Sequence, residues 1–146
     1  MAMLKDHLKE LSGKSAVVVG HSDLVGKSIA LSLLDENATV TVCHKATQAS
    51  DLVRHIQEAD IVVTAAGKPD LIKGAWIKKG AVVIDVGENV VGGKIVGDVE
   101  FEAAFQNASA ITPVPGGVGP LTSLMLVMNL VKLFEDRMAH GNHRAG

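Results

Sequence analysis

The chain has 146 residues, of which 47% are hydrophobic and 21% are charged, a composition typical of a soluble globular protein with one core. The formal net charge of −2 gives no electrostatic reason to expect nucleic acid as a partner. No apolar run approaches the roughly 18 residues that span a bilayer, so no membrane partner is expected. The charged start lacks a signal-peptide pattern and the single cysteine cannot form an internal disulfide, so we expect a cytoplasmic protein.

Strands and helices alternate along the sequence. Apolar spacing predicts helices at 3–11, 24–35, 50–58 and 121–138, and β-branched runs predict strands at 15–20, 38–43, 60–66, 81–87 and 108–112. A Gly-Gly pair predicts a hairpin within 89–97. The expected organisation is a helix and lead-in at 1–14, one domain at 15–138 and a frayed tail at 139–146. This alternation predicts an α/β fold with a doubly wound, mostly parallel, Rossmann-like sheet, and a ligand at the carboxyl ends of its strands.

The first strand runs into a glycine-punctuated turn, "VVVGHSDLVGKS" at 17–28. A helix that begins after such a turn can bind phosphate through its free N–H groups. The dinucleotide fingerprint G-x-G-x-x-G is matched only in part, because its second and third glycines fall on Ser22 and Val25. A purely structural explanation is that Gly20 and Gly26 serve a tight strand-to-helix connection.

The same residues allow a P-loop interpretation. "GKS" at 26–28 matches the end of that motif, and "VVID" at 82–85 matches an acidic strand that assists Mg²⁺. A P-loop has four residues between its glycines, whereas five separate Gly20 from Gly26. A nucleoside triphosphatase is therefore a remote alternative.

The segment "PVPGGVGP" at 113–120 combines residues that fix φ with residues that open positive φ. It specifies one unusual backbone path, and glycines without Cβ atoms let a ligand approach the main chain. We interpret it as the wall of a binding site.

Five segments together carry a family resemblance: "GKSAVVVGHSDLVGKS", "ENATVTVCHKAT", "ADIVVTAAGKPDLI", "GAVVIDVGENVVGGKIVGDVEFE" and "ITPVPGGVGPLT". From about residue 11 to residue 134 the chain resembles the C-terminal, cofactor-binding half of the methylenetetrahydrofolate dehydrogenase/methenyltetrahydrofolate cyclohydrolase family. The resemblance implies hydride transfer from methylenetetrahydrofolate to NADP and hydrolysis of the methenyl product. It places Pro115, Gly116 and Gly117 in a loop between the nicotinamide pocket and the folate cleft. It implies cofactor contacts at Gly20, His21, Ser22, Val25, Gly26, His44, Lys45, Ala65, Ala66, Gly67, Gly87, Glu88 and Thr122.

The end of the second strand favours NADP over NAD. NAD enzymes of this architecture place a carboxylate there for the ribose hydroxyls, but this chain has Cys43, His44 and Lys45. A 2′-phosphate would be attracted to Lys45 and to a protonated His21. Cys43 beside His44 falls far short of a ligand set, so no metal site is expected.

Three positions depart from the family's pattern. His21 stands where the family usually has arginine, so a permanent charge is replaced by one that titrates. Ser28 stands where proline is common. Glu88 replaces an apolar residue beside the nicotinamide, and its carboxylate must be paired or solvated.

The resemblance covers only half of the family's length. The other half carries a Tyr-x-x-x-Lys motif whose lysine does the acid–base work, and this chain contains no tyrosine. Lys45 and Lys68 would lie on the cofactor's side, so no catalytic residue is assigned and the chain alone is expected to be inactive. It is then a truncated or split half that joins a separate N-terminal half, or else a non-enzymatic interaction or regulatory module. The 89–97 hairpin is expected at the edge of the sheet, with exposed β-branched residues. We expect it to form a symmetric homodimer, as the resemblance also implies.

Overall fold

A five-stranded parallel sheet forms the centre of the molecule in the computed structural model, which describes residues 1–141. The strand order is β2-β1-β3-β4-β7, and every neighbouring pair is parallel. The predicted α/β class with a mostly parallel sheet is confirmed. The strands are β1 (Ser15–Val19), β2 (Thr39–Cys43), β3 (Ile61–Thr64), β4 (Val82–Asp85) and β7 (Ala110–Ile111).

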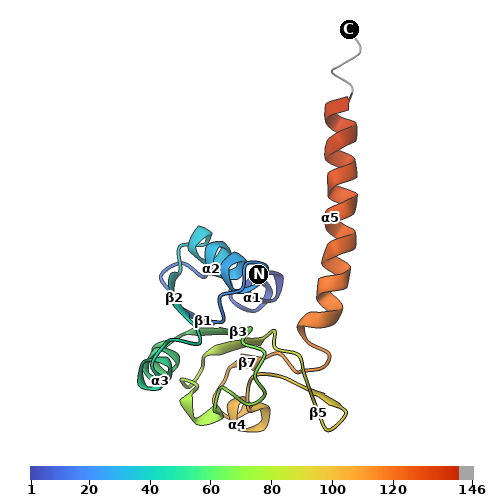
Figure 1. Ribbon diagram of the computed structural model, residues 1–146. Helices are drawn as coiled ribbons and strands as arrows, with labels where there is room; N and C mark the ends of the chain where they lie inside the picture. The colour runs from blue at the N-terminus through green and yellow to red at the C-terminus, as the bar shows by residue number, and fades with distance from the viewer. Residues whose placement is uncertain (142–146) are drawn as a thin grey trace.

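Helices cover both faces of this sheet, as Figure 1 shows. On one face lie α1 (Ala2–His7) and α2 (Gly26–Asp35), and on the other lie α3 (Ala49–Glu58) and α4 (Phe101–Phe105). A short 3-10 helix, η1 (Gly74–Trp76), packs beside α3 and α4. The sheet is therefore doubly wound, and its carboxyl edge is left to the connecting loops.

The central strands bury both faces, which explains their unbroken β-branched sequences. Along β1, Val17 and Val19 pack into the cluster that contains Ile56 of α3. The alternate residue Val18 packs into the cluster that contains Leu33 of α2. Each of these side chains contributes about 1.5–3 kcal/mol through burial, so the two clusters hold the strand ends in a rigid frame.

Some boundaries differ from the sequence-based expectations. The first helix was expected over 3–11 but ends at His7, because Leu8 adopts an extended backbone with φ −102° and ψ 114°. The chain then turns so that Leu11, only 4% exposed, enters the core. Neither η1 nor α4 was predicted, since each is too short to show a helical period.

The predicted hairpin is present as β5 (Asn89–Val91) and β6 (Lys94–Val96). Gly92 and Gly93 form its turn with φ of +56° and +77°, the conformation that a two-residue turn requires. It was expected at the edge of the main sheet, but it forms a separate two-stranded sheet. The expectation of a main-sheet edge is wrong.

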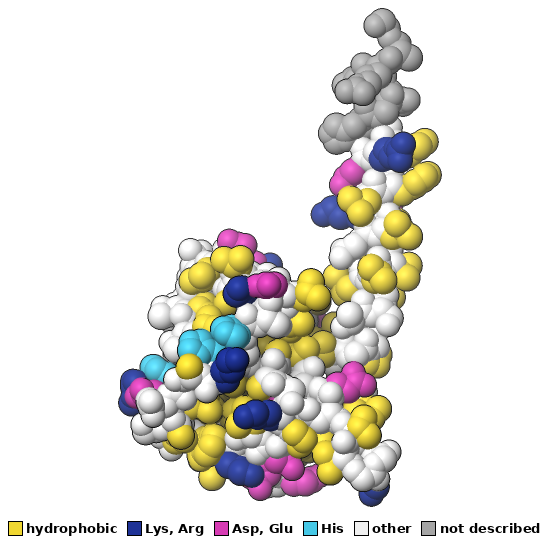
Figure 2. All heavy atoms as spheres, in the orientation of Figure 1, with side chains coloured by type: hydrophobic (Ala, Val, Ile, Leu, Met, Phe, Trp, Pro, Cys, Tyr) yellow, Lys and Arg dark blue, Asp and Glu magenta, His cyan; other side chains and the backbone are white. Residues whose placement is uncertain are grey.

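The last helix, α5 (Val118–Gly141), begins earlier and ends later than the expected 121–138. It projects away from the body of the molecule (Figure 1), and apolar side chains cover much of its visible surface (Figure 2). Its segment Val118–Met138 is long and apolar enough to cross a membrane by length and composition, with none of it buried. The expectation that no apolar segment reaches this length was wrong. Isolated charges such as Lys132 do not lower the mean hydropathy of the helix below that of a membrane-spanning segment. Of the tail expected at 139–146, residues 142–146 lie outside the described chain.

Candidate functional site

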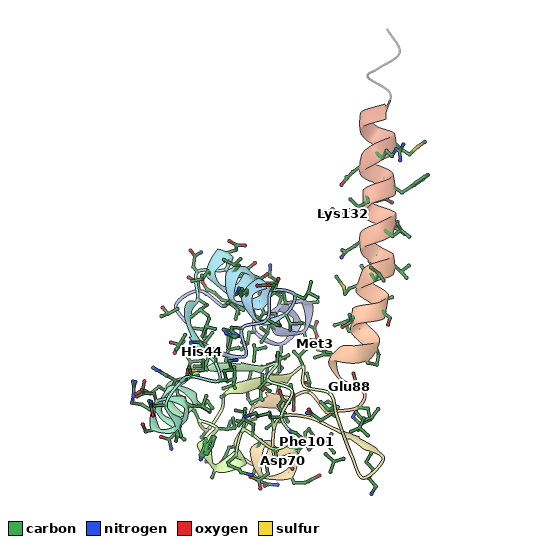
Figure 3. The ribbon with its side chains drawn as sticks, in the orientation of Figure 1. Met3, His44, Asp70, Glu88, Phe101 and Lys132 are labelled. Carbon is green, nitrogen blue, oxygen red and sulfur yellow. The ribbon has the colours of Figure 1, made fainter. Side chains whose placement is uncertain are left out.

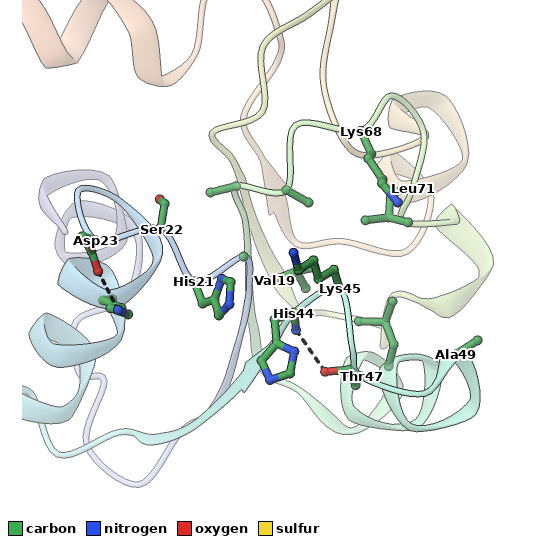
Figure 4. A pocket seen from close by; sticks show the side chains of 15 residues that line it. Val19, His21, Ser22, Asp23, His44, Lys45, Thr47, Ala49, Lys68 and Leu71 are labelled. Carbon is green, nitrogen blue, oxygen red and sulfur yellow. Dashed lines mark hydrogen bonds and ion pairs between the residues drawn. The ribbon is translucent and has the colours of Figure 1, made fainter.

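A pocket of about 700 Å³ opens at the carboxyl ends of β1, β2 and β3 (Figure 4). This is the edge at which a parallel sheet binds its ligand. Seven of the residues predicted to contact the cofactor line it: Gly20, His21, Ser22, His44, Lys45, Ala65 and Ala66. They come from three loops that are far apart in the sequence, and the parallel register brings these loops together.

Two glycines let the first loop pass between its neighbours. Gly20 has a φ of +117°, and a Cβ there would lie 2.3 Å from the carbonyl oxygen of Ala65. At Gly26, the first residue of α2, a Cβ would lie 2.1 Å from the carbonyl oxygen of Gly20. No other residue type fits either place without moving backbone. The start of α2 therefore lies directly against the Gly20 turn, which lines the pocket.

The end of β2 is shaped by hydrogen bonds around His44. Its backbone N–H donates to Thr47 Oγ1 at 3.0 Å, and its ring Nδ1 accepts the backbone N–H of Ala46 at 3.2 Å. The imidazole of His21 lies beside it, with ring centroids 5.0 Å apart and a tilt of 35°. Two histidines from separate loops thus face the pocket side by side (Figure 4).

Basic side chains outnumber acidic ones around the pocket. Lys27, Lys45 and Lys68 line it together with the two histidines, and among residues 1–141 the one lining acid is Asp23. The Asp23 carboxylate is already paired with Lys27 at 2.5 Å, and this hydrogen bond and charge hold its pKa below the usual value. The pocket is therefore suited to an anionic ligand.

Cys43 takes no part in this surface, although it precedes His44. Its side chain is buried, and burial, followed by the charge of Asp51, raises the pKa of the thiol. Within residues 1–141 no group of His, Cys, Asp and Glu side chains is arranged to hold a metal.

Asp98 holds the loop after β3, part of which lines the pocket. It was not identified as a site residue from the sequence. It is fully buried, and its carboxylate accepts the backbone N–H groups of Ala66, Gly67 and Lys68 at 2.6, 3.1 and 2.8 Å. Asn89 Nδ2 donates to the same carboxylate at 2.9 Å. One side chain therefore fixes the loop after β3 and ties it to the hairpin. An aspartate within the apolar run that follows the hairpin was the available signal.

Asp85, at the end of β4, is a second buried carboxylate. Backbone N–H groups of Gly87, Asp98 and Val99 donate to it at 2.9, 3.2 and 2.9 Å. Burial raises the pKa of Asp85, while these three hydrogen bonds oppose the rise. Its oxygens therefore fix the segment after β4 and the segment after the hairpin.

The remaining predicted residues lie outside the pocket. Val25 and Gly67 adjoin it in sequence. Gly87 is buried, and a Cβ there would lie 2.2 Å from Cγ of the Asp98 carboxylate. Glu88 is exposed and lies well away from His44 (Figure 3), which agrees with a solvated carboxylate. The rest follow β7 and begin α5: Pro115, Gly116, Gly117 and Thr122, of which only Gly117 is buried.

A doubly wound parallel sheet with a glycine turn and a cationic pocket at its carboxyl edge defines a nucleotide-binding domain of Rossmann type. More narrowly, the chain belongs to the tetrahydrofolate dehydrogenase/cyclohydrolase family, because residues 1–138 match the model of that family's NAD(P)-binding domain. The sequence is 57% identical over 138 residues to the bifunctional protein FolD of Geotalea uraniireducens, covering 94% of this chain and 49% of that protein. The chain thus spans about half the length of the curated relatives it matches.

Solved structures agree with this assignment. The bifunctional FolD enzyme of Campylobacter jejuni superposes with a TM-score of 0.89 at 46% identity, over 94% of this chain and 48% of that one. The Trypanosoma brucei methylenetetrahydrofolate dehydrogenase-cyclohydrolase, complexed with NADP cofactor and inhibitor, also superposes with a TM-score of 0.89, at 45% identity over 94% of this chain and 49% of that one. The recognised family is confirmed, and the P-loop alternative is wrong.

Proposed function

We propose that this chain is the NADP-binding half of a methylenetetrahydrofolate dehydrogenase/cyclohydrolase and that it catalyses neither reaction alone. The observation that supports NADP as the cofactor is made at the end of β2. His44 and Lys45 stand there in place of the carboxylate that NAD enzymes have. The glycine crossing fits a diphosphate, because Gly20 and Gly26 allow the tight turn and the close packing of helix against strand that a diphosphate-binding loop of this fold requires. NADP, when bound, supplies the hydride acceptor.

The chain's own residues would bind and orient this cofactor. Lys45 and His21 would hold the 2′-phosphate, and the loop of Ala65 to Gly67 would contact the ribose, fixed from behind by Asp98. Gly116, with φ of +105°, shapes a backbone wall after β7 for the folate side. A localisation in the cytoplasm is part of this proposal.

We expect the chain alone to be inactive, because it supplies only the cofactor side of the cleft in which cofactor and folate would meet. Hydride transfer needs the donor and acceptor at near-contact distance, and losing that positioning costs about 7–11 kcal/mol of barrier. The exposed apolar surface of α5 is the face that a separate N-terminal half would cover. A protein half fits it because the relatives are about twice as long as this chain.

The proposal is tested by thermal unfolding with NADP, NAD or ATP–Mg²⁺. At a hundredfold excess over Kd, NADP should stabilise the chain by about 2.7 kcal/mol, a rise in Tm of roughly 5–10 °C. Stabilisation by none of the three would favour a non-enzymatic interaction or regulatory module.

The variant Lys45→Glu sharpens this test. It should weaken NADP more than NAD, because only NADP carries the 2′-phosphate. Lys73→Glu, an exposed charge reversal outside the pocket, is the matched control. Equal losses of both nucleotides in Lys45→Glu would contradict the assignment of the 2′-phosphate to this end of β2.

A further inference from the structure

The β5–β6 hairpin is anchored at both of its ends in one buried cluster. Asn89, its first residue, donates from Nδ2 to the Asp98 carboxylate at 2.9 Å and to the carbonyl oxygen of Val96 at 3.4 Å. At the other end, Asp98 follows the last residue of β6 by two positions and is fully buried. The turn between these ends is exposed and projects from the body of the molecule (Figure 1). The hairpin's orientation therefore depends on this anchor.

The loop after β3 is attached to the same carboxylate. Residues 66–68 donate three backbone N–H groups to it. The chain that follows runs beside the exit of the hairpin, where the backbone N–H of Ile72 donates to the carbonyl oxygen of Asp98 at 3.0 Å. Ala66 and Lys68 also line the pocket. One carboxylate thus stands between the exposed hairpin and the pocket.

The contact between Asn89 and Asp98 is the direct link between hairpin and pocket. Asp85 accepts backbone N–H groups from Gly87, before the hairpin, and from Asp98 and Val99, after it, so the main chain at both ends is fixed. Among residues 1–141, the other donors to the Asp98 carboxylate come from β3 and the loop after it. Only Asn89 brings a donor from the hairpin.

We propose that pairing of this hairpin with the hairpin of a second copy strengthens NADP binding through the contact between Asn89 and Asp98, and that NADP strengthens the pairing in return. A two-stranded ribbon alone is marginal in water. In a single copy the ribbon opens for part of the time, and Asn89 then leaves the carboxylate that holds the loop. Pairing keeps the ribbon closed, and a coupling between two binding sites is reciprocal. This inference rests on the proposed function and on the expected homodimer.

The test compares Kd for NADP in the monomer and in the dimer of the whole chain. Sedimentation velocity gives the concentration at which half of the chain is dimeric, and NADP is titrated well below and well above it. A hydrogen bond to a charged group changes an equilibrium constant roughly ten- to hundredfold. Because the other donors to Asp98 stay in place, we expect a smaller effect, with Kd about five- to tenfold lower in the dimer.

The reciprocal measurement gives a larger signal. A symmetric dimer holds two sites, so saturating NADP should lower the dissociation constant of the dimer by the square of that factor, about 25- to 100-fold. Sedimentation velocity with and without NADP measures this change. A dissociation constant that NADP leaves unchanged would contradict the inference, whatever the variants do.

The variant Asn89→Ala assigns the effect to the proposed link. It should still dimerise, because the exposed side chains of the hairpin are unaltered, but it should bind NADP with the weaker Kd in both states. Lys94→Ala, an exposed change on the same hairpin, is the matched control and should keep the full difference. Val90→Lys with Ile95→Lys should show the weaker Kd at every concentration.

The outcomes separate the inference from the proposed function. Equal Kd values in monomer and dimer of the unaltered chain, or a difference that persists in Asn89→Ala, would overturn the inference and leave NADP binding intact. A chain that stays monomeric at every concentration would overturn it as well, because no second copy then closes the ribbon. Failure to bind NADP in either state would overturn the proposed function itself, and this inference with it.

Discussion

At the scale of single residues, buried carboxylates organise this site more than the pocket's own side chains do. Asp98 accepts four backbone or side-chain N–H groups and the Thr64 hydroxyl, which donates at 3.1 Å. A carboxylate satisfied in this way is stable without water, because each oxygen meets donors only. The loop of Ala66 to Lys68 is thereby fixed before any ligand arrives.

Asp98→Asn tests this role. The amide has the same shape, but its NH₂ group would face backbone N–H donors, so we expect a loss of roughly 2–4 kcal/mol in the free energy of unfolding. Urea denaturation measures it. Asp70→Asn is the control, since Asp70 is exposed and asparagine tolerates its φ of +49°. Equal stability of the two variants would contradict the role given to Asp98.

At the scale of elements, the junction of β1 and α2 depends on close approach. Gly26 and Gly119 both lie in the first turn of a helix, yet only Gly26 faces backbone within 4 Å. The two glycines therefore separate two effects of an added methyl group, steric collision and lowered backbone entropy.

Gly26→Ala should displace the Gly20 turn, with a loss of at least about 2 kcal/mol of stability and at least tenfold weaker NADP binding. Gly119→Ala should be neutral or stabilising by up to about 1 kcal/mol, since nothing lies near its Cβ. Thermal unfolding and calorimetric titration check both. A fully stable, NADP-binding Gly26→Ala protein would show that the close crossing is not required.

Helix α5 is the second element with a clear consequence. Leu126, Leu130 and Leu133 are 71%, 66% and 66% exposed, so they contribute almost nothing to the folded chain alone. Apolar residues around a helix are typical of burial by a partner.

The triple variant Leu126→Gln, Leu130→Gln, Leu133→Gln should leave the unfolding free energy of the isolated chain within about 1 kcal/mol of its original value. It should abolish complementation by an N-terminal half taken from a FolD relative, measured as restored dehydrogenase activity. Lys132→Gln is the matched control on the same helix. Complementation that survives the triple change would show that α5 is not the contact surface.

At the scale of the whole molecule, the hairpin is the surface on which self-association is expected. Val90 and Ile95 are cross-strand partners, 76% and 40% exposed, and the two strands pair with nothing else in the described chain. A two-stranded ribbon alone is marginal in water, so pairing with the same ribbon of a second copy would stabilise it.

Val90→Lys with Ile95→Lys should convert the proposed symmetric dimer to a monomer, because like charges would meet across the two-fold axis. Sedimentation velocity at tens of micromolar reports the mass. Lys94→Ala serves as control on the same hairpin. An unaltered chain that is monomeric at this concentration would refute the dimer directly.

Much of this protein could be predicted without coordinates. Alternating β-branched and helical segments specify a doubly wound sheet, because local periodicity decides which side each residue faces. The Gly92-Gly93 turn is also a local signal, and it was interpreted correctly as a hairpin. The end of β2 at Cys43 was likewise predicted correctly, whereas a 2′-phosphate contact beyond it stays a prediction. Short elements such as α4 were not predicted, because five residues are too few to display a helical period.

Only the tertiary structure decided which distant residues meet. The 5.0 Å approach of His21 and His44 depends on the parallel pairing of β1 with β2, and the bonds from the loop after β3 to Asp98 depend on where the chain returns after the hairpin. The separation of the hairpin from the main sheet and the exposure of α5 were likewise invisible in the sequence. The physical reason is the same in each case: the sequence pattern specifies a residue's local conformation and facing, whereas its partners are set by the packing of the whole chain.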